Sequence, residues 1–292
     1  MPDLLQAIPE PDPIPLPGPP GLLRFLLVLT FLLHLLPMNL VLGGSLLGGV
    51  TEALGRRGNR PHHRELARWL SRAMPAAIAA TITLGVAPLL MLQGLYGRLF
   101  FTASILMARP WLAIVPMLIL AYYGAYLRAL RGDQLGRLGP VAGWGSALLF
   151  VGIGFLFSNN MSLMLRPAEF RRMYLEDGRG WHLDAGDPAL IPRYLHFLIG
   201  SVAVAGMFVV LLGILRRRRQ PEFGDWAIRY GSAWFAHPTA LNIFVGIVWL
   251  VLLPRETMLR FLGGDRLATT VFAAGAALAV VAMILMLQAA KA

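Results

Sequence analysis

Residues 22–47 read LLRFLLVLTFLLHLLPMNLVLGGSLL, and this stretch decides the fold class. About 20 apolar residues at a rise of roughly 1.5 Å each cross the hydrocarbon of a bilayer, so the stretch predicts a membrane-spanning helix. His34 lies near its middle. An imidazole within lipid is costly unless it has a partner, so His34 is a candidate functional residue.

The composition extends this prediction to the whole chain. Hydrophobic residues make up 57% and charged residues 14% of the 292 residues, which is typical of a polytopic membrane protein. We predict an all-α membrane helical bundle forming a single transmembrane domain over 22–292, preceded by a proline-rich extended arm over 1–21. No internal repeat is evident. The seven predicted spans are 22–47, 74–97, 108–130, 141–165, 188–214, 231–253 and 267–289.

The positive charge lies between the apolar spans. The net charge is +11, but its arginines cluster in loops, as in Arg216 to Arg219, so it does not indicate nucleic-acid binding. The loops after the first, third and fifth predicted spans carry more basic residues. In the loops at the opposite membrane face, arginines alternate with Asp and Glu. This bias predicts an external N-terminus and a cytoplasmic C-terminus. We expect a multi-pass protein of the inner (plasma) membrane of a bacterium.

Two absences narrow the chemistry. The chain has no cysteine, which excludes disulfides, thiolate ligands, cysteine-bound iron–sulfur clusters and covalent haem attachment by this chain. We place all 15 carboxylates in loops or termini and none inside a span. Because proton pumps and many ion-coupled transporters need buried Asp, Glu or His, this pattern argues against a proton-delivery path and against carboxylate-coupled transport.

A second imidazole lies within an apolar run of the fifth span, at His196. With the predicted topology, His34 and His196 lie about 9 or 10 residues from the external ends of their spans, at a shared depth of roughly 13–15 Å. Two such imidazoles in a chain without cysteine point to axial ligation of haem iron. Histidines in membrane helices also form hydrogen bonds across helices, so a packing role stays open.

Other polar residues have weaker patterns. His237 is predicted in the cytoplasmic half of its span, as a ligand of an inner haem, a lining of a quinone pocket or a structural hydrogen-bonding group. His62 and His63 are expected at a solvated surface. His182, in the external acidic loop, has an open role. A metal site is one candidate for it.

Two arginines and three other polar residues lie near the predicted outer surface. Arg193 and Arg166 are candidates for pairing with haem propionates, because arginine binds carboxylates through two parallel hydrogen bonds. Simple extension of the arginine side chains to the interface is the alternative. Asn159, Asn160 and Tyr194 form a candidate quinone site, with helix packing and capping as the alternative.

The order of four segments resembles a known family. RFLLVLTFLLHLL, RELARWLSRAMPAAIAATITLGVAP, GWGSALLFVGIGFLFSNNMSLMLRP and RYLHFLIGSVAVAGMFVVLLG are similar to helices of subunit I of cytochrome bd quinol oxidases. The resemblance covers about residues 22 to 215. It implies an external N-terminus, a haem ligand at His34 in the first helix and a low-spin b haem ligand at His196 in the fifth.

The departures from that family concern oxygen reduction. The family's third helix carries glutamates for the oxygen-reducing haem, whereas Val115 and Tyr123 stand at the matching positions here. The family's long external quinol loop and its Gly-Arg-Gln-Pro-Trp motif are absent. The methionine that is the other ligand of the low-spin haem has only Met258 as a nearby counterpart. The resemblance therefore implies electron transfer without oxygen reduction.

Together these observations predict a membrane b-type cytochrome that passes electrons between the quinol pool and an external c-type cytochrome or another periplasmic redox partner. His34 and His196 would bind haem b, either as one pair or each on its own haem. The alternative is a non-redox permease or assembly subunit in which the buried histidines are structural. A third reading is a membrane anchor that relays electrons for a periplasmic partner.

Overall fold

The computed structural model describes residues 15–58, 60–132, 134–136 and 138–291. Within these ranges it contains helices and connecting turns and no strand. Seven helices are long and apolar enough to cross a membrane, which confirms the predicted all-α polytopic bundle. They are α2 (Pro20–Arg57), α3 (Pro61–Leu106), α4 (Ala108–Arg131), α5 (Leu138–Met164), α7 (Leu190–Arg217), α8 (Pro221–Leu252) and α10 (Arg266–Lys291).

The first helix begins at a proline, Pro20. Proline is common at this position. The first N–H groups of a helix have no partner within it, so the missing N–H of proline loses no hydrogen bond. Residues 15–19 precede the helix without regular structure. The remainder of the predicted N-terminal arm, residues 1–14, lies outside the described residues.

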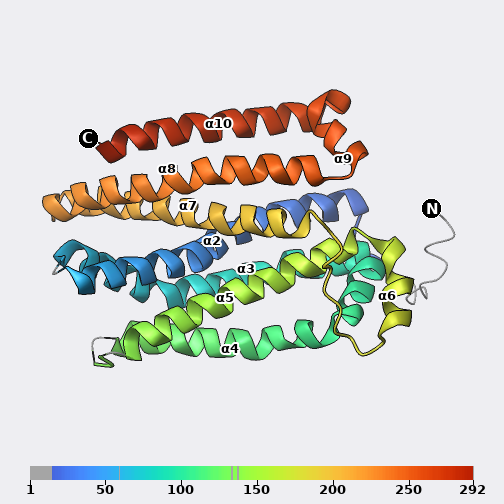
Figure 1. Ribbon diagram of the computed structural model, residues 1–292, viewed down its shortest axis with the longest axis horizontal. Coiled ribbons are helices and arrows are strands. Elements are labelled where there is room, and N and C mark those ends of the chain that lie inside the picture. The colour runs from blue at the N-terminus through green and yellow to red at the C-terminus, as the bar shows by residue number, and fades with distance from the viewer. Residues whose placement is uncertain (1–14, 59, 133, 137, 292) are drawn as a thin grey trace.

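The long helices pack as antiparallel neighbours. α2 pairs with α3, α4 with α5 and α7 with α8, while α10 lies along α8 alone (Figure 1). α2 also packs on α7, where Gly43 lies so close to the Ser201 carbonyl that an added Cβ would overlap it. Glycine at a helix crossing permits this approach of two backbones. The α2–α3 and α7–α8 hairpins are thereby joined side by side.

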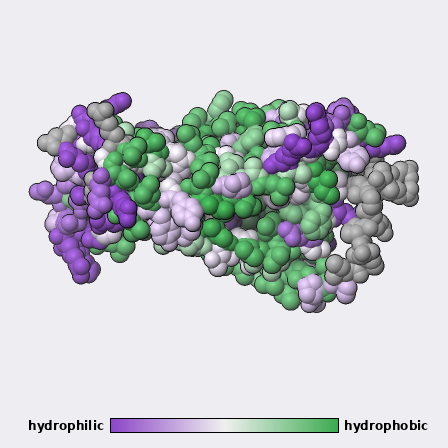
Figure 2. All heavy atoms as spheres, turned by 90° about the horizontal axis from the view of Figure 1, so that it is seen from below, coloured by the Kyte–Doolittle hydropathy of each residue, from purple (hydrophilic) through white to green (hydrophobic). Residues whose placement is uncertain are grey.

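The surface is apolar across the middle and polar at both ends (Figure 2). One end collects the C-terminal turns of α2, α4 and α7, which carry Arg56, Arg131 and Arg216. We call it the arginine-rich end. The other end carries η1 (Pro167–Glu169), α6 (Phe170–Glu176), α9 (Arg255–Leu259) and η2 (Arg260–Gly264), and we call it the α6 end. An apolar belt between two polar ends is the surface that a bilayer requires, so the chain is a multi-pass membrane protein.

Several helices extend beyond the predicted spans. α3 has 46 residues and bends at Tyr96, where the backbone leaves helical geometry (φ −130°, ψ 29°). The segment after this bend packs Phe100 and Leu106 against Leu163 of α5 and Phe170 of α6. This apolar cluster closes the α6 end beneath the loop at 177–189. The sequence prediction ended the span at residue 97 and missed it, because the segment covers the bundle end instead of crossing the bilayer.

Candidate functional site

His34 lies on the α6 side of the α2–α3 hairpin and is half-buried. Its Nδ1 is 3.0 Å from the carbonyl oxygen of Thr81 on α3. Because a carbonyl oxygen only accepts hydrogen bonds, Nδ1 carries the proton and a neutral ring presents its lone pair at Nε2. Nε2 has no hydrogen-bond partner in the described part of the chain. An added Cβ at Gly85 would lie 2.9 Å from Cε1 of His34, so glycine makes room for the ring.

His196 repeats this arrangement in the α7–α8 hairpin. Its Nδ1 is 3.2 Å from the carbonyl oxygen of Asn242 on α8, and no described residue bonds its Nε2. Gly246, one turn beyond Asn242, would place an added Cβ 3.0 Å from Cε1 of His196. Trp249 packs on the ring at a centroid distance of 5.4 Å. Each hairpin thus holds one imidazole by its Nδ1 and leaves Nε2 available.

The two hairpins share one local arrangement, which the sequence analysis did not identify. Leu-His-x-Leu occurs at 33–36 and again at 195–198. The facing helices share Ala-x-(Thr/Asn)-Ile-x-(Leu/Val)-Gly-(Val/Ile), at 79–86 and 240–247. The repeat is only about eight residues long on each facing helix, and apolar residues of any membrane helix resemble one another. The imidazole contacts reveal which of these residues are equivalent.

The structure does not bring His34 and His196 into contact. They precede the ends of α2 and α7 by about 23 and about 21 residues, or roughly 35 and 32 Å at helical rise. His34 faces α3, whereas His196 faces α8. Counted from the other ends of the helices, His34 lies 14 residues into α2 and His196 only six residues into α7, so the predicted shared depth stays a prediction. The orientation shows that each ring belongs to its own hairpin.

Unpaired buried polar atoms surround His196. Arg193, one turn earlier on α7, is 9% exposed, and its guanidinium lies 5.9 Å from the Trp249 ring. Arg193 forms an ion pair with Asp187 at 3.5 Å, yet its Nη1 makes no hydrogen bond. The indole Nε1 of Trp249 and the Oδ1 of Asn242 are likewise buried without partners. Buried polar atoms are normally paired, so the Arg193 and Trp249 donors fit an acceptor outside the described chain and the Asn242 oxygen fits a donor.

Arg166 belongs to a separate polar cluster at the α6 end. It pairs with Asp184, which is fully buried, and with Glu169 at 3.6 Å. The Ser162 hydroxyl lies 2.9 Å from the Asp184 carboxylate and 2.5 Å from that of Asp187, and it can donate to one of them at a time. This cluster ties the loop at 177–189 to α5 and, through Asp187, to Arg193. Arg166 therefore supports the loop, whereas Arg193 borders the His196 site.

The three candidate quinone residues have internal partners. Asn159 and Asn160 are fully buried. Asn159 accepts the Asp184 N–H at 3.2 Å, and Asn160 donates to Ser104 at 3.1 Å. The Tyr194 hydroxyl donates to the Val151 carbonyl of α5 at 2.6 Å. The Nδ2 of Asn159 and the Oδ1 of Asn160 are buried without partners in the described part of the chain.

His237 lies near the middle of α8, which extends from Pro221 to Leu252. Its ring is exposed and its Nδ1 donates to Ala233 of its own helix at 2.8 Å. A groove of about 480 Å³ lies beside it, between α7 and α8. Like the two buried imidazoles, His237 keeps Nε2 unbonded to any described residue.

The three remaining histidines have structural contacts. His62 and His63 are partly exposed, and the first turn of α3 packs them against Trp226 of α8 at centroid distances of 5.6 and 4.7 Å. His182 bonds the Asp177 carbonyl through Nε2 at 2.6 Å. No group of three metal-ligating side chains occurs among the described residues, so His182 has no metal cluster there.

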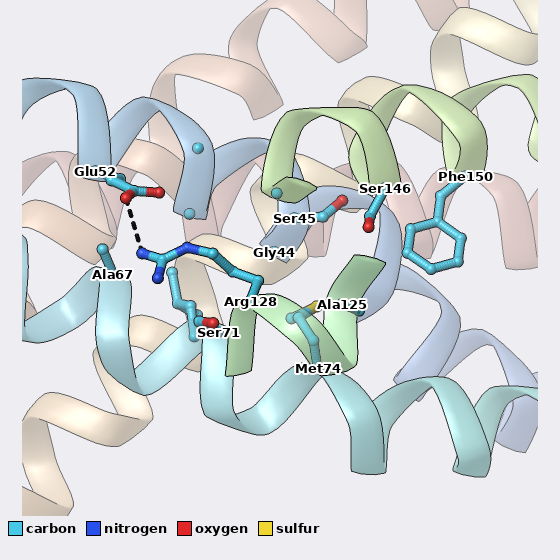
Figure 3. A pocket seen from close by; sticks show the side chains of 14 residues that line it. Gly44, Ser45, Glu52, Ala67, Ser71, Met74, Ala125, Arg128, Ser146 and Phe150 are labelled. Atoms are coloured by element: carbon cyan, nitrogen blue, oxygen red, sulfur yellow. Dashed lines mark ion pairs between the residues drawn. The ribbon is translucent and has the colours of Figure 1, made fainter. Parts of the chain in front are cut away.

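A small polar pocket opens near the arginine-rich end, between α2, α3, α4 and α5 (Figure 3). Glu52 of α2 pairs there with Arg128 of α4 at 2.8 Å, with side chains 12% and 11% exposed. The prediction that every carboxylate lies in a loop or terminus is therefore wrong for Glu52, which the arginine of another helix stabilises. The hydroxyl of Ser71 is buried without a partner beside this pair. The volume of about 50 Å³ suits one or two water molecules.

Comparisons with known proteins assign no family to the chain. Neither protein-family models nor curated proteins match it. Its function must therefore be argued from the site.

Haem fits the donor set of the two hairpins. A metal-bound histidine usually donates its other ring N–H to a carbonyl or carboxylate, and that bond fixes the ring and its tautomer. His34 and His196 both have this bond, and both leave Nε2 for a metal. Arg193 and Trp249 supply unpaired donors for the carboxylates that haem carries. Each hairpin thus offers one imidazole nitrogen as a candidate metal ligand.

Proposed function

We propose that this protein is a membrane b-type cytochrome that passes electrons between hydroquinones of the bilayer and a redox partner outside it, such as a c-type cytochrome. The single observation that carries the proposal is the repeated imidazole arrangement. Hydrogen bonding between helices alone requires neither two equivalent glycines nor two unbonded Nε2 atoms. Bound haem would supply one-electron transfer, and the bilayer would supply the hydroquinone.

The orientation of the rings favours one haem for each hairpin over a single haem shared by His34 and His196. Each imidazole is held against the other helix of its own hairpin. Arg193 and Trp249 would pair with haem carboxylates near His196, while Asp187 holds Arg193 in place. This division agrees with the resemblance to cytochrome bd subunit I.

The arginine-rich end is assigned to the cytoplasm of a bacterium by the positive-inside rule, with the chain in the inner membrane. The α6 end and both proposed haem ligands then lie toward the outside. This placement puts the haem sites near an external electron acceptor.

A visible spectrum of the purified protein tests the proposal. Dithionite should produce the alpha band of ferrous haem b, decylubiquinol should reduce the same haem, and added cytochrome c should reoxidise it. His182→Ala is the matched control, because its Nε2 is already bonded in the loop. A folded, colourless protein would instead support the permease or assembly-subunit alternative.

A further inference from the structure

An arginine on each of two helices marks the border of the apolar belt at the arginine-rich end, where hydrophilic side chains gather (Figure 2). Arg72 of α3 precedes residues 73–97, and Arg216 of α7 follows residues 194–215. Neither stretch contains Asp, Glu, Lys or Arg, and each is long enough to cross the hydrocarbon of a bilayer. Both arginines therefore lie at the level of the lipid headgroups.

Trp69 joins the two helices at this level. The guanidinium carbon of Arg216 lies 3.8 Å from the centroid of its ring, the shortest contact of this kind among the described residues. Trp69 also packs against the apolar cluster that contains Leu70 of α3 and Val209 of α7. Stacking on an indole fixes the plane of the guanidinium, and the N–H donors that lie in that plane stay available to a ligand.

The arginines at this border have no acidic partner. Arg68 and Arg72 are exposed, and neither they nor Arg216 form an ion pair in the described part of the chain. The adjacent Arg217, by contrast, pairs with Asp225 at 2.7 Å. Arg68 and Arg72 lie one helical turn apart, where two like charges repel each other. A bound anion would relieve this repulsion.

The surroundings of these charges define the occupant further. Glu65 is the acid nearest in sequence, and it forms no ion pair with any described residue. Leu215, directly before Arg216, is 76% exposed and extends the site into the apolar belt. The occupant must combine a negative charge at the headgroup level with an apolar part in the hydrocarbon. Anionic phospholipids have both, and basic pockets between membrane helices bind them.

We propose that the junction of α3 and α7 binds the headgroup of an anionic phospholipid, with Arg72 and Arg216 donating hydrogen bonds to its phosphate. The stacked guanidinium of Arg216 can bind two phosphate oxygens in parallel, and Arg72 adds a second charge from the neighbouring helix. Zwitterionic phospholipids carry the same phosphate together with a cation, which the unpaired arginines disfavour. This lipid site goes beyond electron transfer and does not depend on bound haem.

Native mass spectrometry of the full-length protein, titrated with phosphatidylglycerol or with phosphatidylcholine of the same acyl chains, tests the proposal. Phosphatidylglycerol should bind at least about tenfold more tightly. Arg72→Gln and Arg216→Gln should each weaken its binding about fivefold, the effect of one arginine near an anionic surface, and change binding of phosphatidylcholine by less than about twofold. Arg218→Gln, at the same end but outside the stack, and Arg171→Gln, at an exposed position of α6, are the matched controls and should change neither by more than about twofold.

Equal affinity for the two lipids would overturn the proposal. An equal loss in Arg218→Gln would also overturn it, because the attraction would then come from the charge of the whole end and not from one site. Displacement of phosphatidylglycerol by millimolar inorganic phosphate would assign the site to a soluble anion instead. Arg72 is exposed, so Arg72→Gln keeps the test valid if Arg216→Gln does not fold. The mass of the bound lipid is read directly, so a colourless protein would reject the haem proposal and leave this test unchanged.

Discussion

The α2–α3 and α7–α8 hairpins hold equivalent imidazoles in unequal surroundings. In both, Nδ1 bonds a carbonyl of the facing helix and a glycine one turn later makes room for the ring. Around His196, Arg193 and Trp249 add buried donors that lack partners. Around His34, α2 exposes apolar side chains such as Phe25, Leu32 and Leu36. The comparison teaches that the ligand geometry is shared, whereas the polar environment that would tune a haem is built only in the second hairpin.

Removing one imidazole at a time should have the largest effect. We expect His196→Ala and His34→Ala each to lose the haem of its own hairpin and to keep the other, because the rings face different helices. Reduced-minus-oxidised spectra with a redox titration would resolve the two components. If either variant alone abolishes the whole signal, one haem is shared and the equivalence of two separate sites fails.

Substituting Gly85 and Gly246 tests whether the two imidazole sites are equivalent, one ring at a time. Gly246→Val should displace His196, and Gly85→Val should displace His34, because an added Cβ already lies 3.0 or 2.9 Å from each ring. Such overpacking typically costs about 1–3 kcal/mol. Each variant should lower the haem content of its own hairpin. Gly275→Val is the matched control, since nothing lies within 4 Å of its added Cβ, and a similar loss there would contradict a specific contact.

Disrupting the polar cluster at the α6 end should lower the thermal stability of the α7–α8 hairpin more than that of the α2–α3 hairpin. Asp184→Ala leaves the Arg166 guanidinium without its buried partner and should lower the free energy of unfolding by about 2–4 kcal/mol. Because this cluster reaches Arg193 through Asp187, the His196 component should be lost at a lower temperature than the His34 component. Glu176→Ala, at a side chain 56% exposed, is the control for thermal unfolding followed at both haem signals. Simultaneous loss of both components would show that the cluster does not act locally.

The smallest effect concerns the pH response of the loop at 177–189. The hydrogen bond from the Arg179 side chain holds the pKa of Asp177 below its ordinary value of 3.8. Because the folded-state pKa is depressed, the stabilising contribution is present above 3.8 and is lost as the pH falls through the lower folded value. Limited proteolysis of the loop should therefore be unchanged by mild acid and increase only in strong acid. Asp177→Asn should remove this acid step, and its persistence would assign it to another carboxyl group.

The sequence predicted the bundle because a run of about 20 apolar residues is long enough to cross a bilayer as a helix. It also placed His34 and His196 inside membrane-spanning helices, since both lie within long apolar runs. It could not show which way an imidazole points, so the Thr81 and Asn242 carbonyls and the two glycines were missed. It also missed that Glu52 lies inside α2, because its partner Arg128 is on a helix far along the chain.

Haem content per chain, measured as pyridine haemochrome, tests the central claim most directly when the double variant His34→Ala/His196→Ala is compared with the unaltered protein. Unbonded Nε2 atoms at these two positions predict haem in the unaltered protein and none in a double variant that still folds with native helix content. Haem retained by the double variant at the unaltered level, or an unaltered protein without haem, would contradict the claim.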